Sequence, residues 1–487
     1  MRSRNAPRRA RRSLVRILLI LAVLAALALA AAAVGAAWFL DSRGVTPRAL
    51  APYVVKRSSG HNPAIEQSGQ LMSRTLLSLD RGSQYAGDEA LLKLRPGAQD
   101  AATPPTAKRA VSVLGVEQLQ AAMAGALPGD VITLAPGDYL VDGGELLATR
   151  PGAKGSPVVV RANRPGSVTI DMNLVEGFKV SAPYWTFENL TIRGACKTQD
   201  SCEHAFHVVG DADHFTARNN TILDFNAHFK INGHEGAFPD HGAIIGNTIT
   251  NTTVRNTGRA VTLIDMVAVS DWIIRGNVIT DFIKGGGDQI SYGVFAKGAG
   301  ARNVFEQNIV VCEHLLRSPG QRVGMSLGGG GTGKQYCRDG RCITEQEDSV
   351  IRSNLIASCS DDGIYLNNAA RSVVSHNTVL ETGGIVVRFA GSSADIEGNL
   401  VDGAIRSRDG GTLRAKDNVA SSIMAAYFGI HAPRSQYTGW SVATLEWDGE
   451  PLRRKQASTG GTPDLCGTAR PAAPAYGAFE ALAGCRK

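Results

Sequence analysis

A short motif built around asparagine recurs through the middle of this chain and constrains its fold more than any other feature. In each copy an apolar segment leads to an asparagine, and Ile, Val or Leu follows closely. Consecutive asparagines lie 19 to 46 residues apart, and most steps fall between 22 and 31. A period of this size, filled with short β-branched strands and turns, predicts a parallel β-helix. The asparagines are Asn189, Asn220, Asn247, Asn277, Asn308, Asn354, Asn377, Asn399 and Asn418.

The repeat also predicts how the coils are held together. No coil can bury its apolar face alone, so successive coils stack at about 4.8 Å and share one core. Asparagine suits a left-handed turn, and its amide both donates and accepts hydrogen bonds. We therefore expect the asparagines to bond from coil to coil as a buried ladder. A β-sandwich with scattered turn asparagines is the alternative, but it would not keep nine of them in step.

The flanks of the repeat predict a cap and further segments. Val116, Leu119, Met123 and Leu127 have helical spacing, and Pro128 ends the pattern. We expect this helix to cover the open edge of the first coil. The predicted units are a basic segment 1–16, an apolar segment 17–40, an exported segment with a Pro/Ala-rich linker 41–110, the β-helix 111–420 and a C-terminal extension 421–487.

The N-terminus predicts export and attachment to a membrane. Residues 1–16 contain seven arginines and no acidic residue, and residues 17–40 contain no charge. An apolar helix of that length reaches about 36 Å, enough to cross a bilayer, and the arginines favour the cytoplasmic side. We expect a transmembrane anchor in a bacterial inner membrane with the body in the periplasm. The alternative is a signal peptide cleaved within 31–37, which releases the exported body.

Charge and cysteine content agree with an exported body. The chain has 51 Lys and Arg against 44 Asp and Glu, and without the seven N-terminal arginines the numbers are 44 and 44. A neutral body gives no support to a nucleic-acid partner. Eight cysteines without a CxxC pair favour disulfides over a metal site. We predict bridges Cys196–Cys202 and Cys337–Cys342 and a bridge or thiol pair Cys312–Cys359, while Cys466 and Cys485 bracket the tail.

Three strands align by their glycines and apolar alternation, and they predict an outward-facing polar row. The segments are GVFAKG at 293–298, GIYLNN at 363–368 and GIVVRF at 384–389. If their first apolar residues point inward, one outward row holds Lys297, Asn367 and Arg388, and the neighbouring row holds Phe295, Tyr365 and Val386. Cations beside aromatic faces suit an acidic sugar, because the cations bind its carboxylate and the rings stack on it.

The opening coils carry a family resemblance. The stretch PGDVITLAPGDYLVDGG at 128–144, followed by LATRPGAKGSPVVVRA at 147–162, resembles right-handed parallel β-helix proteins of the chondroitinase B and alginate lyase type. The ending AYGAFE at 475–480 resembles a final motif of many exported members of that group. The resemblance implies a right-handed β-helix and an anionic polysaccharide as partner.

The resemblance also implies catalytic roles. SYGVFAKGAGARNVFEQN resembles the coil that bears the family's lysine base, which points to Lys297, and QRVGMSLGG resembles the coil that bears its arginine, which points to Arg322. Strand alternation instead places Gly328 beside Lys297. The family binds calcium through acids just before the lysine, where this chain has Ile290 and Tyr292, so calcium is an open cofactor.

Two further groups of residues compete for the site. The loop-like segment 228–242 carries Lys230, His234, Asp240 and His241, and its PDH sequence is similar to a motif of β-helix alginate epimerases. A structured loop with bonded histidines is the alternative interpretation.

The adjacent Asp361 and Asp362 resemble the paired acids of polygalacturonases, although Asp-Gly is also a common coil turn.

These observations predict an envelope-anchored, exported β-helix that acts on an anionic polysaccharide, most directly as a lyase working by β-elimination. The first alternative is a non-catalytic polysaccharide-binding or envelope scaffold protein. A polygalacturonase-like or epimerase-like enzyme is the second.

Overall fold

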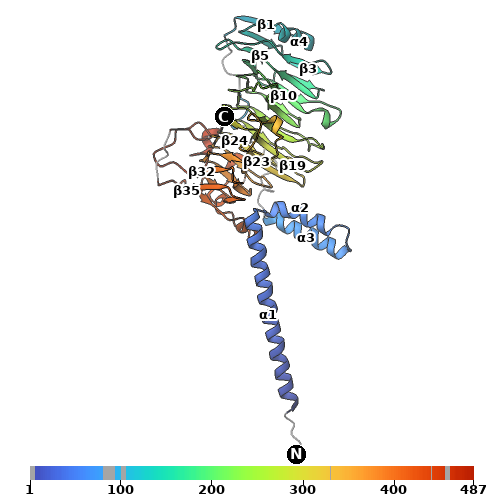
Figure 1. Ribbon diagram of the computed structural model, residues 1–487, viewed down its shortest axis with the longest axis vertical. Helices are drawn as coiled ribbons and strands as arrows, with labels where there is room; N and C mark the ends of the chain where they lie inside the picture. Colours follow the sequence, from blue (N-terminus) through green and yellow to red (C-terminus); the bar gives the residue numbers. More distant parts are fainter. Residues whose placement is uncertain are drawn as a thin grey trace, which may run out of the picture.

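The strands of this chain stack into a right-handed parallel β-helix (Figure 1). The computed structural model describes residues 6–79, 91, 94–99, 106–329, 331–439, 441–455 and 461–486. Residues 1–5 of the basic segment and 100–105 of the expected linker lie outside this set. Within the described residues the strands form three long sheets and one short sheet.

Each complete coil contributes one strand to each long sheet, and the incomplete coils at the two ends contribute to only one or two of them. The first sheet contains β1 (Arg109–Val113), β2 (Asp130–Leu134), β5 (Val158–Ala162), β8 (Trp185–Glu188), β11 (Thr216–Arg218), β14 (Ala243–Ile245), β17 (Ile273–Arg275), β21 (Val304–Glu306), β25 (Val350–Arg352), β29 (Ser372–Ser375), β32 (Ser393–Glu397) and β35 (Thr412–Lys416). The second contains β4 (Leu146–Ala148), β7 (Glu176–Val180), β10 (His204–Val209), β13 (Ala227–Asn232), β16 (Val261–Val267), β19 (Ile290–Lys297), β23 (Gln321–Leu327), β27 (Ile364–Asn367), β31 (Gly384–Arg388) and β34 (Ala404–Arg408). The third contains β3 (Gly137–Val141), β6 (Val168–Met172), β9 (Thr191–Gly194), β12 (Thr221–Leu223), β15 (Thr248–Thr250), β18 (Val278–Thr280), β22 (Ile309–Val311), β26 (Leu355–Ala357), β30 (Thr378–Leu380), β33 (Leu400–Val401) and β36 (Val419–Ala420). The short sheet contains β20 (Gly300–Ala301), β24 (Gln346–Glu347) and β28 (Ala369–Ala370).

The asparagine ladder is confirmed from Asn220 to Asn418. Each side-chain amide in this row donates to the side-chain oxygen of the next asparagine at 2.9–3.1 Å. Asn189 does not belong to it, because Leu190 holds that place and its backbone N–H donates to Asn220. The left-handed residue is the one before each ladder asparagine, such as Gly246 with a φ of 64°.

Apolar side chains from all three sheets point inward and make one continuous core. The rings of Phe178, Phe206 and Phe229 stack along the axis, with centroids 5.4 and 5.1 Å apart. Helix α4 (Val116–Ala124) covers the first coil and places Leu119 and Met123 in this core. The capping helix is therefore confirmed, although it ends at Ala124, where Gly125 caps it.

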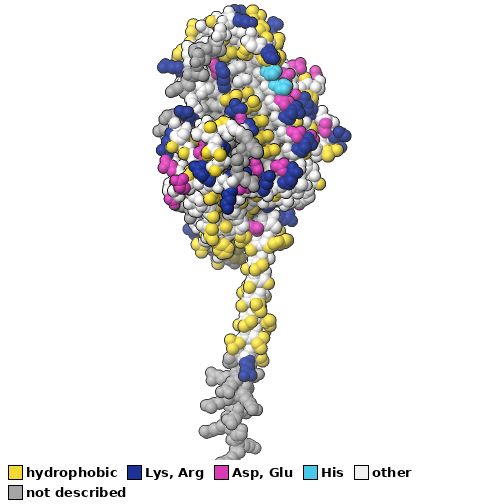
Figure 2. Space-filling view, turned by 90° about the vertical axis from the view of Figure 1, so that its left-hand side faces the viewer, with side chains coloured by type: hydrophobic (Ala, Val, Ile, Leu, Met, Phe, Trp, Pro, Cys, Tyr) yellow, Lys and Arg dark blue, Asp and Glu magenta, His cyan; other side chains and the backbone are white. Residues whose placement is uncertain are grey.

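The N-terminal segment is helical. Helix α1 (Ala6–Arg43) contains a stretch, Arg16–Arg43, that is long and apolar enough to cross a membrane. Helix α1 projects from the body, and hydrophobic side chains line its described part (Figure 2). The helices α2 (Pro47–Ser58) and α3 (Pro63–Leu79) form a hairpin where the sequence predicted no elements.

The residues after the last coil include α5 (Ile423–Tyr427) and short 3-10 helices. The extension packs Leu465 and Phe479 on the outer face of the third sheet, against residues such as Leu355. Among the described residues the 3-10 helices are η3 (Gln199–Ser201), η4 (Lys334–Tyr336), η5 (Arg434–Gln436), η6 (Val442–Thr444) and η7 (Leu482–Cys485).

All eight cysteines are paired, which agrees with an extracytoplasmic body. The predicted pairs Cys196–Cys202, Cys312–Cys359 and Cys337–Cys342 are disulfides with Cα separations of 5.6, 4.9 and 5.6 Å. Cys466–Cys485 closes the C-terminal extension.

Candidate functional site

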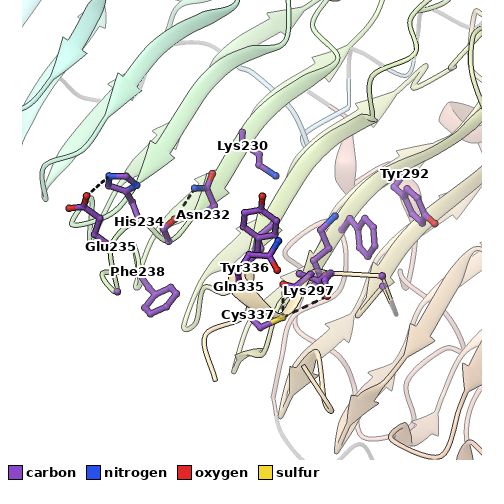
Figure 3. A pocket seen from close by; sticks show the side chains of 18 residues that line it. Lys230, Asn232, His234, Glu235, Phe238, Tyr292, Lys297, Gln335, Tyr336 and Cys337 are labelled. Carbon is purple, nitrogen blue, oxygen red and sulfur yellow. Dashed lines mark hydrogen bonds and ion pairs between the residues drawn. The ribbon is translucent and has the colours of Figure 1, made fainter. Parts of the chain in front are cut away.

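A cavity of about 700 Å³ lies over the outward face of the second sheet, where β13, β16 and β19 end (Figure 3). Lys230 and Lys297 stand at its floor, and His234 stands on its rim. Two sequence predictions, the row around Lys297 and the loop after Lys230, therefore meet in one cavity.

The two lysines share one carboxylate. Asp265 lies 2.5 Å from Lys230 Nζ and 3.3 Å from Lys297 Nζ. Burial pushes the pKa of Asp265 upward, but the two ammonium groups outweigh burial and hold the pKa below its usual value. Asp265 is thus an ionised group that fixes both cations under the cavity.

Strand alternation explains this arrangement. In β13, Phe229 and Ile231 point into the core, so Lys230 between them points outward. The register pairs Lys230 with Asp265 and Asp265 with Phe295, which makes a row of outward side chains across three coils. Val267 and Lys297 form the next row, so Lys297 is diagonal to Asp265 and close enough to bind it.

Aromatic rings line the other side of the floor. Lys297 Nζ lies 4.1 Å from the centre of the Phe295 ring, and that ring stacks on Tyr292 at 4.4 Å. A side chain at Gly329 would meet the Phe295 ring at 2.6 Å, so glycine there lets the following loop approach the ring. The floor therefore offers a ring face as well as charge to a ligand.

Two loops wall the cavity. One follows β13 over 233–238, and the other follows β23 and includes Gln335 and Tyr336 of η4. Arg338 joins the two loops, because its guanidinium donates to both carboxylate oxygens of Asp240 at 2.8 and 2.7 Å and lies over the Phe238 ring. We call this contact the Arg338–Asp240 clasp.

The polar row continues beyond Lys230 toward the N-terminal coils. His207 Nε2 bonds Asn232 at 3.0 Å, and His207 Nδ1 lies 3.0 Å from Glu176. Burial, with smaller effects of His207 and Lys230, lowers the pKa of His204 to about 4. Neutral His204 therefore adds no cation to this end of the row at neutral pH.

The strand register places Lys297, Asn367 and Arg388 in one row, as the three glycine-led strands predicted. Asn367 pairs with Arg388, and the register carries the row through Gly328 to Lys297. Tyr365 lies in the Phe295 row, and its hydroxyl accepts a bond from Arg388 at 3.0 Å. Arg388 also binds Asp409 at 2.6 Å, outside the cavity.

The structure does not bring Arg322 to Lys297. The register pairs Arg322 with Ser291, which lies about 20 Å from Lys297 along an extended strand. Arg322 is fully buried, with its Nε 3.4 Å from Glu313. The pairing of Val294 with Met325 leaves Gly328 beside Lys297, as alternation predicted.

The remaining predicted residues lie away from the cavity floor. His241 occupies a left-handed turn and stacks on His214 at 5.1 Å, while Asp240 belongs to the clasp. Asp361 and Asp362 come just before β27, at the end of the strand opposite to Asn367, and Arg406 binds Asp362 there at 3.0 Å. Burial and the neighbouring carboxylate raise the pKa of Asp362 to about 7.

The donor set at the cavity does not fit calcium. The floor carboxylate, Asp265, already binds two ammonium groups, which repel a cation. The described residues hold no cluster of three or more His, Cys, Asp or Glu side chains in reach of one metal ion. Calcium takes six to eight oxygen ligands, so the site around Lys297 offers it no cage.

Sequence reasoning assigned no role in the site to Asp265, Tyr336 or Arg338. Asp265 interrupts the apolar strand VTLIDMV, and an acid in such a strand is a usable signal. Tyr336 and Arg338 come from a long insertion between coils, and local pattern does not predict which part of the sheet such an insertion covers.

Comparison with known proteins supports the fold. No family model matches the chain. Pectate lyase L of Dickeya chrysanthemi is 29% identical over 119 residues, which cover 22% of this chain and only 28% of that protein. Among solved structures, pectate lyase Pel9A aligns with a TM-score of 0.53 at 15% identity, over 81% of this chain and all of that one. An alginate lyase from Paenibacillus sp. str. FPU-7 aligns with a TM-score of 0.42 at 17% identity, over 64% of this chain and 96% of that one. The alignment with Pel9A shows a shared parallel β-helix.

Proposed function

We propose that this protein is a membrane-anchored lyase that cleaves a uronate-containing polysaccharide by β-elimination in the Lys230–Lys297 cavity. One observation carries the proposal: two lysines share the buried Asp265 at the floor of an open cavity, beside the ring of Phe295. Two cations and a ring face are what an acidic sugar requires.

The residues divide the reaction between them. Lys230 binds the sugar carboxylate and stabilises the charge that develops when the neighbouring carbon loses its proton. Lys297 acts in its neutral amine form and accepts that proton, while Lys230 remains the ammonium that binds the carboxylate. The electron pair forms a double bond, the carbon–oxygen bond to the leaving sugar breaks, and the leaving oxygen takes up a proton from water. Asp265 contacts the side-chain nitrogens of both lysines and holds them in place, so it is a positioning residue.

Polygalacturonate is the first substrate to test. The relative with a matching segment is named a pectate lyase. The two lysines of the cavity floor favour an acidic sugar over a neutral one. Alginate and chondroitin follow, because a carboxylate-bearing ring is the feature that the two lysines recognise.

The anchoring part of the proposal rests on α1. Its apolar stretch is exposed along its length, and the arginines before it favour the cytoplasmic side. The β-helix then lies on the outer side of the membrane, where its disulfides form.

The test is an ultraviolet assay for the unsaturated uronate product on the three polysaccharides. We expect Lys297→Ala to lose about 10²-fold or more in kcat/KM, the usual contribution of a proton-transfer group. Lys230→Ala should lose about as much, the usual contribution of a group that stabilises developing charge. Lys416→Ala, at an exposed lysine of β35, is the matched control and should act as wild type. Thermal melting of each variant separates lost chemistry from lost folding.

A second candidate is a polysaccharide-binding protein without catalysis. It is favoured by the ion pairs of both lysines with Asp265, because a paired ammonium binds a carboxylate well and accepts no proton. Binding of polygalacturonate that depends on Lys230 and Lys297, with no product from any of the three polysaccharides, would establish this candidate and refute the lyase.

A further inference from the structure

The helical hairpin α2–α3 begins immediately beyond the apolar stretch of α1. Residues 44–46 separate the end of α1 from Pro47 at the start of α2. The hairpin runs crosswise to α1 at the foot of the body (Figure 1). If α1 crosses a bilayer, the hairpin lies at the level of the lipid headgroups and close to parallel with the membrane.

The exit of α1 is fixed to the body by several contacts. Thr46 donates through Oγ1 to the carbonyl of Ser360 at 3.2 Å, and the Tyr427 hydroxyl donates to the carbonyl of Val45 at 2.9 Å. Arg48 lies 3.8 Å from Glu313 in the body. These contacts therefore fix the positions of the hairpin and α5 along the axis of α1, next to its C-terminal end.

This foot exposes large apolar side chains. Met72 and Leu71 of α3 are 56% and 61% exposed, and Phe428 after α5 is 72% exposed. Hydrophobic side chains gather on the underside of the body where α1 leaves it (Figure 2). The exposed apolar residues of this foot are Ile65, Leu71, Met72, Phe428 and Ile430. Tyr53, Val55 and Leu77 are also exposed, but they line a cavity between the hairpin and the body.

The charge of the hairpin suits an anionic lipid surface. Among the described residues of the hairpin, Arg57 and Arg74 are exposed cations outside the cavity toward the body, which Lys56 lines, and the only acidic residue is Glu66. Helices with exposed apolar residues and basic flanks lie in the interface between headgroups and acyl chains, about 5–10 Å deep. Each basic residue near such a surface adds attraction to acidic lipids.

We propose that the α2–α3 hairpin and the segment after α5 form a second membrane contact, which rests in the outer headgroup layer around α1. The partner is the lipid surface itself. This inference rests on the anchoring by α1 and is independent of the chemistry in the cavity. Together the span and the foot hold the β-helix upright, so that its coils stack away from the membrane.

Spin labels on the full chain in proteoliposomes of phosphatidylethanolamine and phosphatidylglycerol test the contact. All eight native cysteines are in disulfides, so an introduced cysteine is the only free thiol for the label. We label Met72→Cys and Phe428→Cys at the foot and Leu24→Cys in α1. The matched control is Leu140→Cys, an exposed leucine of β3 at the far end of the β-helix.

We expect the labels at 72 and 428 to be several-fold more accessible to oxygen and several-fold less accessible to a nickel chelate than the label at 140. Labels at 72 and 428 that match 140 while the label at 24 is lipid-exposed would overturn the contact and leave the anchor standing. A water-exposed label at 24 would overturn both. Spin–spin broadening at 72 that disappears on dilution with unlabelled chain would assign the foot to a second copy instead of lipid.

Discussion

Replacing Asn377 with alanine tests the ladder that holds the coils together. The fully buried Asn377 amide donates to the carbonyl of Ile351 and to the side chain of Asn399, both at 3.0 Å. Its oxygen accepts from the backbone and side-chain N–H groups of Asn354, also at 3.0 Å. Alanine leaves buried groups on two neighbouring coils without these bonds, at about 1–3 kcal/mol for each group.

We therefore expect Asn377→Ala to lower the free energy of unfolding by about 2–5 kcal/mol. Guanidinium unfolding in detergent, followed by circular dichroism with the disulfides intact, measures the change. Asn256→Ala, at an exposed asparagine outside the ladder, is the control and should stay within about 0.5 kcal/mol of wild type. Changes this small at Asn377, Asn354 and Asn399 alike would refute the reasoning.

Two further predictions concern the cavity and its surroundings. Arg338→Ala opens the clasp and should raise KM about tenfold, because a lost charge-assisted pair is worth about 1.5 kcal/mol, whereas Arg341→Ala in the same loop should leave KM unchanged. An unchanged KM in Arg338→Ala would show that the clasp does not shape the site. Burial lowers the pKa of His204 to about 4, so native His204 stays neutral while the unfolded chain takes up a proton below about pH 6.5. Between pH 7 and pH 5 wild type should lose about 2 kcal/mol of stability relative to His204→Gln, and parallel pH profiles of unfolding would contradict this.

The fold could be predicted from the sequence because its cause is local and repeated. Strand alternation in each coil decides which side chains enter the core, and the step between ladder asparagines sets where each coil begins again. The bridge Cys312–Cys359 followed from the same periodicity, since both cysteines come shortly after a ladder asparagine. The prediction for Asn189 was wrong because asparagine also suits the left-handed turn, which lies one residue before the ladder position. Asn189 occupies that turn, and Leu190 occupies the ladder position.

The site could be predicted only in part. Alternation placed Lys297, Asn367 and Arg388 in one outward row, because outward direction within a strand is a property of the strand itself. The same alternation already separated Arg322 from Lys297, and the family resemblance pointed the other way.

The sequence by itself determined the coils, the ladder, three of the four disulfide pairs and the outward row, whereas the tertiary structure decided which residues share a cavity. Lys230 and Lys297 are 67 residues apart in the sequence, and they meet because two strand registers bring both to Asp265. The loop with Tyr336 and the hairpin α2–α3 took their places through contacts with distant coils, such as the Arg338–Asp240 clasp and the bond from Thr46 to Ser360. Periodicity carries no information about such contacts, because the position of an insertion depends on the surface it packs against and not on its own pattern.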